Sequence, residues 1–246
     1  MIKGIYHSAA GMVPEYYRLI NVSNNLANAN TTAFKADRRY FRTLINNEIV
    51  QPGFQGQPRR HKDLDTGLQT QFAQGALKRT DTMTDFALNG DGFFVVEDSA
   101  TGKRFYTRNG WFQMNNESEL LTHKGMNVLD DTGSPIVVEG NEFVMTENGE
   151  IFSQGESRGK IMVVKFDDPT VLIKQGDGLY HNNSDIEPIP AEEARVMQGH
   201  LEESNVNIVE EMVDMISLNR SYESSTKALL AQDETLKQAV NQVSKF

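Results

Sequence analysis

Apolar residues recur every seven positions at both ends of the chain. The repeat consists of Ile208, Met215, Tyr222, Leu229, Leu236 and Val243 at the C-terminal end, and of Ile2, Ala9 and Tyr16, interleaved with Ile5, Met12, Leu19 and Leu26, at the N-terminal end. A seven-residue repeat places a narrow apolar stripe along one side of a helix, as in a coiled-coil seam. We therefore predict a helix at each end that packs on the other helix or on other subunits. This arrangement points to assembly rather than catalysis.

The two predicted helices have recognisable ends. The first spans residues 1 to about 28. Pro14 lies inside it and predicts a kink or a late start, because an interior proline loses one backbone hydrogen bond. The second helix spans residues 204 to 246, and its candidate N-caps are Ser204, Asn205 and Asn207. Glu210 stands three residues after Asn207, as in a capping box.

Residues from about 76 to 200 show short apolar runs separated by glycine-containing turns. The pair Asn89-Gly90 stands between the runs 86–88 and 93–96, and this pattern predicts a β-hairpin. Further strands are predicted at residues 104–107, 110–114, 126–129, 136–138, 142–145, 151–153 and 160–166. Many short strands with regular turns favour an antiparallel sandwich, barrel or rolled sheet.

The predicted fold class is α+β, with N- and C-terminal helices packing as a coiled-coil-like assembly domain and a central all-β antiparallel domain. The predicted divisions are an N-terminal helical assembly segment (1–35), a linker or extended segment (36–75), the central β domain (76–200) and a C-terminal helical assembly segment (201–246). Around the first boundary, the apolar residues Phe34, Tyr40, Phe41, Leu44 and Ile45 are spaced to continue a short helix. The polar stretch after Gln51-Pro52-Gly53 is typical of a linker, or of a segment that becomes ordered on assembly.

Composition removes several function classes. The 246 residues carry a formal net charge of −10 with scattered basic residues, so we expect no nucleic-acid partner. The chain has no cysteine, which excludes disulfides, thiol catalysis and cysteine-ligated metal sites. No run is apolar enough for a transmembrane helix or a secretory signal. We therefore expect no membrane insertion, and an uncut N-terminus if the protein acts outside the cytoplasm.

Motifs that suggest enzyme chemistry are weak. Asp-Thr-Gly occurs at residues 65–67 and 131–133, and aspartic proteases pair two such aspartates. Because Asp-Gly-rich tripeptides are ordinary turns, we interpret both copies as turns. Gly-Asp-Gly occurs at residues 90–92 and 176–178 without phosphate-loop spacing, and the five histidines show no metal-ligand spacing. We predict no catalytic, cofactor-binding or metal-binding residues, no cofactor and no enzymatic activity.

Asparagines are dense between residues 23 and 32. They are either solvated residues at a helix end or polar groups that fix register and partner within an apolar seam, and we favour the second interpretation. The C-terminal helix carries a companion stripe that is apolar only at its ends, at Met212, Asn219, Thr226, Asp233 and Val240. A helix packed among several neighbours satisfies such polar groups better than a two-stranded coiled coil does.

Three stretches resemble the flagellar basal-body rod and hook protein family. Residues 23–35 (SNNLANANTTAFK) are similar to the N-terminal signature of the family, and residues 85–96 (DFALNGDGFFVV) with 106–110 (YTRNG) are similar to its central domain. Residues 198–207 (QGHLEESNVN) are similar to its C-terminal signature, together with Glu211, Met212, Met215, Ile216, Arg220, Ser221, Tyr222, Glu223 and Asp233. Ala33 departs from the family, which usually has glycine before the Phe-Lys pair. The modest length favours the proximal-rod type, and Gln51-Pro52-Gly53 keeps the distal-rod type open.

The resemblance implies a structural role in the flagellar basal body. Members of the family are axial subunits, exported unfolded by the flagellar type III apparatus without signal cleavage. Their terminal helices form an inner tube and the β domain lies outside it. The implied partners are copies of the chain, neighbouring rod proteins and the export apparatus, and the implied location is the periplasmic rod. The predicted subunit-interface residues are Ile2, Ile5, Ala9, Met12, Tyr16, Leu19, Asn24, Asn25, Leu26, Asn28, Asn30, Phe34, Ile208, Met212, Met215, Ile216, Tyr222, Leu229, Leu236 and Val243.

Other functions stay open on the sequence alone. Within the family, the alternative is a distal rod or hook-type axial protein. Outside it, one alternative is an aspartic hydrolase that uses Asp65 and Asp131. The other is a soluble adaptor whose terminal helices pair within one monomer.

Overall fold

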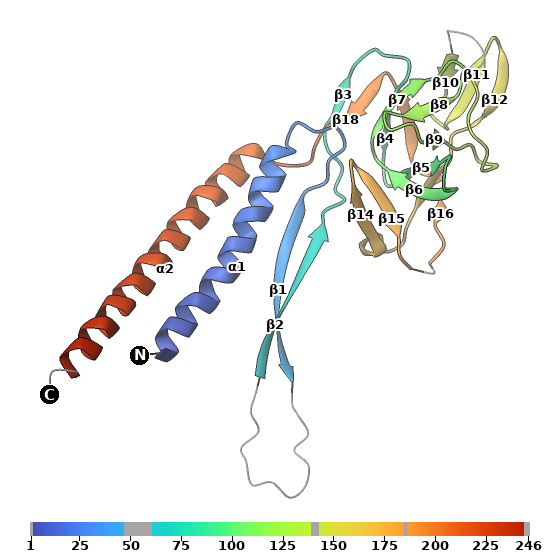
Figure 1. Ribbon diagram of the computed structural model, residues 1–246. Coiled ribbons are helices and arrows are strands. Elements are labelled where there is room, and N and C mark those ends of the chain that lie inside the picture. Colours follow the sequence, from blue (N-terminus) through green and yellow to red (C-terminus); the bar gives the residue numbers. More distant parts are fainter. Residues whose placement is uncertain (1, 47–60, 139–142, 185, 244–246) are drawn as a thin grey trace, which may run out of the picture. The chain divides into compact units, whose positions relative to one another are not determined.

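The computed structural model describes residues 2–46, 61–138, 143–184 and 186–243, which group into two compact units (Figure 1). The helical unit comprises Met1–Ala27, Asp37–Thr70 and Asn207–Phe246, and the β unit comprises Asn28–Ala36 and Gln71–Val206. The fold class is α+β with antiparallel strands, as predicted from the sequence. The boundaries of the two units differ from the four predicted segments. Residues 28–36 belong to the β unit, and the expected linker is divided between both units.

The helical unit pairs α1 (Ile2–Ala27) with α2 (Ile208–Val243) side by side (Figure 1). Asn25 contacts Glu211, whereas Glu15 accepts a hydrogen bond from Ser221, so the two helices run antiparallel. Four residues of the predicted stripe are half-buried on α2, namely Met215, Tyr222, Leu229 and Leu236. The stripes therefore meet within one chain, and coiled-coil assembly between chains stays a prediction. Neither helix, over its described residues, is long and apolar enough to cross a membrane.

The start of α2 is set by Asn207. Its Oδ1 accepts hydrogen bonds from the backbone N–H groups of Val209 (3.1 Å) and Glu210 (3.4 Å), as an N-cap does. Of the three candidate caps, Asn207 is thus the one that the structure uses. In α1, Pro14 lies inside a helix that begins at Ile2, so the proline does not delay the start of the helix.

The expected short helix after Phe34 is absent from the described residues, and this prediction was wrong. The segment instead forms β1 (Asp37–Asn46), which pairs antiparallel with β2 (His61–Thr70) from Asp37 opposite Thr70 to Asn46 opposite His61. The spacing of the apolar residues fits a helix, but their aromatic and branched side chains also suit a strand once a partner is available. Tyr40 lies directly opposite Gly67, where any Cβ would lie 2.0 Å from the tyrosine ring.

The two Asp-Thr-Gly copies have different structures. Residues 65–67 lie within β2, so the interpretation of this copy as a turn was wrong. Residues 131–133 do form a turn, in which the Thr132 N–H donates to Asp130 Oδ1 (2.9 Å) and Gly133 adopts a φ of 84°. The pairing of β2 with β1 overrides the local turn preference at the first copy.

The β unit is built from sixteen short strands and one 3₁₀ turn among its described residues. They are β3 (Leu77–Arg79), β4 (Asp85–Asn89), β5 (Phe93–Asp98), β6 (Lys103–Thr107), β7 (Gly110–Met114), β8 (Leu120–Thr122), β9 (Asn127–Val128), β10 (Phe143–Met145), β11 (Glu150–Ser153), β12 (Glu156–Lys160), β13 (Val163–Lys165), η1 (Pro169–Val171), β14 (Leu172–Gly176), β15 (Leu179–Asn182), β16 (Ile189–Pro190), β17 (Arg195–Gln198) and β18 (His200–Glu202).

Most of these strands belong to one eleven-stranded sheet. Its order is β14-β15-β6-β5-β9-β8-β7-β4-β17; in addition, β13 pairs with β5, and β16 pairs with β13. A second sheet has the order β10-β11-β12, and β18 pairs with β3. Most predicted strands are present, but residues 136–138 form a single isolated bridge, from Val137 to Glu119. The predicted strand 160–166 is divided between β12 and β13.

The hairpin predicted around Asn89-Gly90 is not formed. β4 pairs with β7 and β17, whereas β5 pairs with β6, β9 and β13. All residues of 85–88 and 93–96 are buried, so both runs occupy the core and find partners on other strands. Gln74 holds the connection, because its Nε2 donates to Leu88 O (2.9 Å) and its Oε1 accepts from Gly90 N (3.1 Å).

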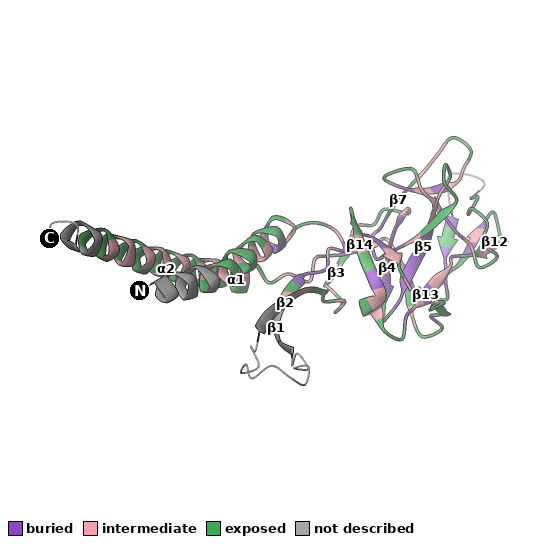
Figure 2. Ribbon diagram, turned by 60° about the horizontal axis from the view of Figure 1, so that its bottom comes forward, coloured by how far each residue is buried: buried purple, intermediate pink, exposed green. Residues whose placement is uncertain are grey.

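The hydrophobic core lies in the β unit (Figure 2), where the buried residues concentrate in the strands. The larger of two clusters includes Phe86, Phe94, Phe112 and Ile151, each at most 2% exposed. Along α1 and α2, by contrast, the described side chains are half-buried or exposed apart from Asn25. A single helix pair cannot cover both faces of its members, so apolar surface stays available on each helix.

Candidate assembly site

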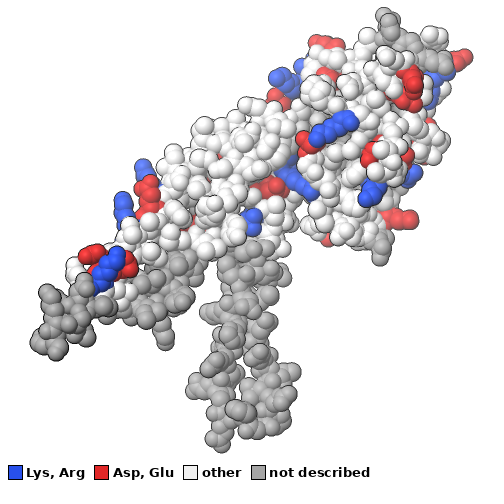
Figure 3. All heavy atoms as spheres, in the orientation of Figure 1, with Lys and Arg blue, Asp and Glu red and all other residues white. Residues whose placement is uncertain are grey.

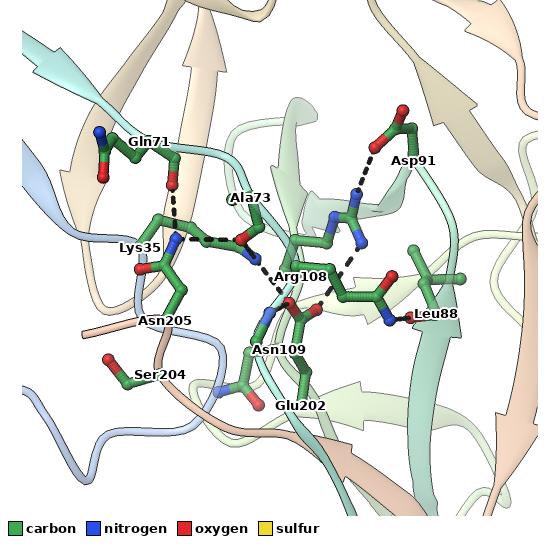
Figure 4. A network of polar contacts seen from close by, with 12 residues as sticks. Lys35, Gln71, Ala73, Leu88, Asp91, Arg108, Asn109, Glu202, Ser204 and Asn205 are labelled. Carbon is green, nitrogen blue, oxygen red and sulfur yellow. Dashed lines mark hydrogen bonds and ion pairs between the residues drawn. The ribbon is translucent and has the colours of Figure 1, made fainter. Parts of the chain in front are cut away.

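Three buried charged residues form the centre of the β unit's polar interior (Figure 4), and we call Lys35, Arg108 and Glu202 the buried charge cluster. Lys35 Nζ donates to Glu202 Oε1 (2.5 Å) and to the carbonyl oxygen of Ala73 (2.8 Å). Arg108 Nη1 donates to the Gly90 carbonyl oxygen (2.9 Å) and lies 3.7 Å from the second oxygen of Glu202. The cluster joins the three stretches that carry the family resemblance.

Burial dominates the electrostatics of this cluster. It lowers the pKa of the Lys35 ammonium, and the neighbouring Glu202 carboxylate works in the opposite direction. Burial also lowers the pKa of the Arg108 guanidinium, whereas Glu202 and, more weakly, Asp91 raise it. Asp91 is nearly fully exposed at 4.0 Å from the guanidinium, so Glu202 is the principal counter-charge for both cations.

Hydrogen bonds to backbone groups near Lys35 and Glu202 surround the buried charge cluster. The Ala33 N–H donates to the Glu202 carbonyl oxygen (2.8 Å), and the Ala36 N–H donates to Asn205 Oδ1 (2.8 Å). Asn205 Nδ2 donates in turn to the carbonyl oxygens of Gln71 (2.8 Å) and Ala73 (2.9 Å). Asn205 therefore joins residues 36 and 71–73 rather than capping α2.

A second polar centre lies in the helical unit at Asn25, which is 2% exposed. Its Oδ1 accepts from Asp37 N (3.0 Å), and its Nδ2 donates to Asp37 O (3.0 Å) and Glu211 Oε1 (3.1 Å). Asn21 Nδ2 donates to the same Asp37 carbonyl oxygen at 2.9 Å. Burial raises the pKa of Glu211, while the hydrogen bond from Asn25 opposes that shift. Asn25 thus fixes the register of α1, α2 and β1 within one chain.

The predicted interface residues fall into three groups. The half-buried ones are Met12, Leu19, Leu26, Asn28, Phe34, Met215, Tyr222, Leu229 and Leu236. The exposed ones are Tyr16, Asn24, Asn30, Ile208, Met212 and Ile216, while Asn25 is buried. The side chains of Ile2, Ile5, Ala9 and Val243 lie outside the described residues. Among those with described side chains, the exposed group is the most accessible to another subunit.

Each helix also carries a stripe of exposed apolar residues, of which the seven-residue repeat includes only Tyr16. Tyr16 also reaches the partner helix, because its ring centroid lies 6.5 Å from that of Tyr222. The α2 outer stripe consists of Val209, Met212, Val213 and Ile216, which are 69%, 49%, 60% and 54% exposed. The α1 outer stripe consists of Val13, Tyr16, Tyr17 and Ile20, which are 52%, 51%, 41% and 44% exposed. Both stripes have the i, i+3, i+4, i+7 spacing of one helix face. This spacing is present in the sequence and predicts the stripes when each helix is searched for a second apolar face.

Comparison with known proteins places these features in a family. Residues 197–243 match the model described as flagellar basal body rod FlgEFG protein C-terminal, and residues 87–154 match the flagellar hook protein FlgE/F/G D1 domain. The flagellar basal-body rod protein FlgF of Caulobacter vibrioides is 39% identical over 92% of this chain and 91% of that protein. The flagellar basal-body rod protein FlgG of Borreliella burgdorferi is 32% identical over 96% of this chain and 97% of that protein. The flagellar hook-basal body complex protein FlhO of Bacillus subtilis is 30% identical over the whole of both chains.

Proposed function

Because the chain belongs to the flagellar basal-body rod protein family, we propose that it is a non-enzymatic structural subunit of the bacterial flagellar rod. It polymerises through its terminal helices into the axial shaft that transmits rotation for motility. Its partners are copies of itself, neighbouring rod proteins and the flagellar type III export apparatus. Its place is the periplasmic rod of the basal body, which it reaches with an uncut N-terminus.

The observation that carries the proposal is the pair of outer stripes. After α1 and α2 have paired, eight large side chains in two helical stripes remain between 41% and 69% exposed. Figure 3 shows uncharged surface on the helix pair between two groups of charged side chains. Contiguous apolar surface of this kind is uncommon on proteins that stay monomeric, and it marks interaction sites. It therefore supports a subunit that binds further chains over an adaptor whose helices are fully covered by pairing within one monomer.

The two stripes suit an open assembly. A contact between different surfaces of identical subunits forms a filament when the rotation between subunits does not close. If the α1 outer stripe of one subunit contacts the α2 outer stripe of the next, every added subunit exposes a new stripe for the following one. The half-buried stripe residues Met215, Tyr222 and Leu229 then hold the helix pair together instead of contacting other chains.

Charged substitutions in the α2 outer stripe test the proposal. Met212→Asp with Ile216→Asp places two carboxylates in the stripe, where burial against another subunit would desolvate them. Self-association should weaken by at least about thirty-fold, the effect of losing roughly 2 kcal/mol at an interface hot spot. Sedimentation velocity measures the association, and motility of complemented cells measures the function.

A matched control separates the stripe from general charge effects. Ser224→Asp with Ala228→Asp adds the same charges at the same spacing on exposed positions of α2 outside the stripe. Circular dichroism should show equal helix content in both variants. Equal self-association and motility of the two variants would remove the stripe from the assembly mechanism.

We assign the proximal rod as the position of the subunit. The 39% identity to a protein named FlgF, against 32% to a protein named FlgG, supports this assignment. A distal position is the alternative. A density tag fused to this chain, located by electron cryotomography of intact basal bodies, should lie at the inner-membrane end of the rod. A tag at the outer end would overturn the proximal assignment and leave the structural role unchanged.

A further inference from the structure

A pocket of about 360 Å³ opens on the β unit beside Trp111, the only tryptophan of the chain. The turn Asn30–Thr32 lines one part of it. Trp111, His123 and Asn109 line another part, together with Lys124 and Asp177. Its volume lies within the range of small-ligand sites, about 300–1,000 Å³. Neither the fold nor the proposed assembly through the helices explains why this pocket is present.

The indole of Trp111 is held in place while remaining accessible. Its ring stacks on the imidazole of His123, with centroids 4.5 Å apart and planes tilted by 11°, yet Trp111 is 47% exposed. Its backbone N–H donates to Asn109 Oδ1 (3.0 Å). At the preceding Gly110, any Cβ would lie 1.8 Å from the Phe86 carbonyl oxygen, so the backbone packs tightly at this point. The result is a rigid aromatic surface that faces solvent.

Hydrogen-bonding groups without partners surround this surface. Among the described residues, the side chains of Asn30 and Thr32 make no hydrogen bond. The Oδ1 of Asn109 is occupied by Trp111, which leaves its Nδ2 as a donor. Lys124 pairs with Asp177, so the two charges of the lining cancel. The pocket therefore offers a neutral set of amide and hydroxyl donors and acceptors next to an aromatic face.

We infer that this pocket binds a neutral glycan, with one pyranose ring on the indole of Trp111. The C–H groups on one face of a pyranose carry small positive charges and pack on the negative face of an aromatic ring. Its hydroxyl groups both donate and accept, which matches Asn30, Thr32 and the free Nδ2 of Asn109. A phosphate or carboxylate ligand would need a surplus of cations, and the Lys124–Asp177 pair provides none.

The single tryptophan gives a direct test on the full-length chain. Titration with maltotriose and with the trimer of β-1,4-linked N-acetylglucosamine should change Trp111 fluorescence saturably for at least one of them. The expected Kd lies between about 0.1 and 10 mM, as for few contacts at an open site. Sorbitol, which has hydroxyl groups but no ring, should give no saturable change. The two sugars distinguish a plain glucan from an N-acetylated glycan.

Variants that keep the fluorophore locate the site. Asn30→Ala with Thr32→Ala should weaken sugar binding at least about five-fold, because two hydrogen bonds are removed. Asn183→Ala, an exposed asparagine outside the pocket, should leave the Kd unchanged. The inference is overturned if neither trisaccharide gives a saturable change, or if the pocket variant binds as tightly as the wild type. It is also overturned if Trp111 emission responds only to protein concentration, since the pocket is then a contact between copies of the chain.

Discussion

The ammonium of Lys35 lies 2.5 Å from a carboxylate oxygen of Glu202, although 167 positions separate the two residues in the chain. Both side chains are fully buried, and Arg108 brings a second cation to 3.7 Å from the same carboxylate. A buried charge without its partner is costly, so this pair ties the segment that follows α1 in sequence to the segment that precedes α2. The β unit is thus completed only when both segments are in place.

Removing either member of the pair should destabilise the β unit strongly. Lys35→Met leaves Glu202 with Arg108 alone, and Glu202→Gln leaves two buried cations without a carboxylate. Each change should lower the free energy of unfolding by about 3–5 kcal/mol. Urea denaturation followed by Trp111 fluorescence measures the loss. The double variant should cost less than the sum of the single losses, because the residues share one interaction. Strictly additive losses would show that the pair is not coupled.

A fragment of the chain should fold stably as the β unit only if it contains all three residues of the buried charge cluster. A fragment of residues 28–206 retains Lys35, Arg108 and Glu202 and should unfold as one cooperative unit. A fragment of residues 28–200 lacks Glu202 and should be less stable by about 3–5 kcal/mol. A fragment of residues 37–206 lacks Lys35 and should be weakened similarly. Equal denaturation midpoints for all three fragments would contradict the role of the cluster.

How far the sequence alone predicts this fold depends on whether the decisive signal is local. The helices, a set of three candidate caps that includes Asn207, and most strands follow from periodicity and capping within a few residues. The Lys35–Glu202 pair has no local signal, because nothing near either residue indicates a partner 167 positions away. The prediction of a hairpin at Asn89-Gly90 was wrong for a related reason. Its turn signal is genuine, but both flanking runs are buried and pair with other strands.

Local patterns were also ambiguous where the same spacing of apolar residues fits both a helix and a strand. Tyr40, Phe41, Leu44 and Ile45 fit a helix, and the pairing with β2 decides in favour of a strand. In the assembly site, the seven-residue repeat described the half-buried seam between the helices, and the predicted interface included only Tyr16, Met212 and Ile216 of the outer stripes. Val209 and Val213 were missed because a single repeat describes only one face of a helix.

Ala33 should tolerate glycine but not a branched side chain. It adopts a φ of 55°, which favours glycine, and it is 1% exposed. Ala33→Gly relieves the backbone strain, but it removes a buried methyl group and raises the conformational entropy of the unfolded chain. The free energy of unfolding should therefore change by no more than about 1 kcal/mol. Ala33→Val should cost more than about 2 kcal/mol, because a β-branched residue is strained at this φ and overfills the site. Thermal unfolding of both variants measures the difference, and equal melting temperatures would argue against the strained backbone.

The helical unit should become more stable on mild acidification through Glu211. Burial raises the pKa of this carboxyl above its ordinary value of 4.5, so the folded state binds a proton more readily than the unfolded state does. Between 4.5 and the raised pKa, stability therefore increases as the pH falls and decreases as the pH rises. Urea unfolding followed by circular dichroism at 222 nm, a helix signal, measures this dependence.

Glu211→Gln provides the control for the pH effect. Its amide oxygen still accepts the hydrogen bond from Asn25, but the side chain no longer titrates. The variant should be more stable than the wild type at neutral pH and should lose the increase on acidification. An unchanged pH profile would assign the effect to another group.

Site-specific photo-crosslinking at Val213 in flagellated cells tests the proposed assembly most directly. Val213 is 60% exposed and lies in the middle of the α2 outer stripe. A photoreactive residue at this position should form crosslinks to a second copy of the chain or to a neighbouring rod protein. The crosslinks should disappear in a strain that cannot export flagellar proteins, and a photoreactive residue at the exposed Asn183 of the β unit serves for comparison. Normal flagella with no crosslink from Val213 to another chain would contradict assembly through this helix face.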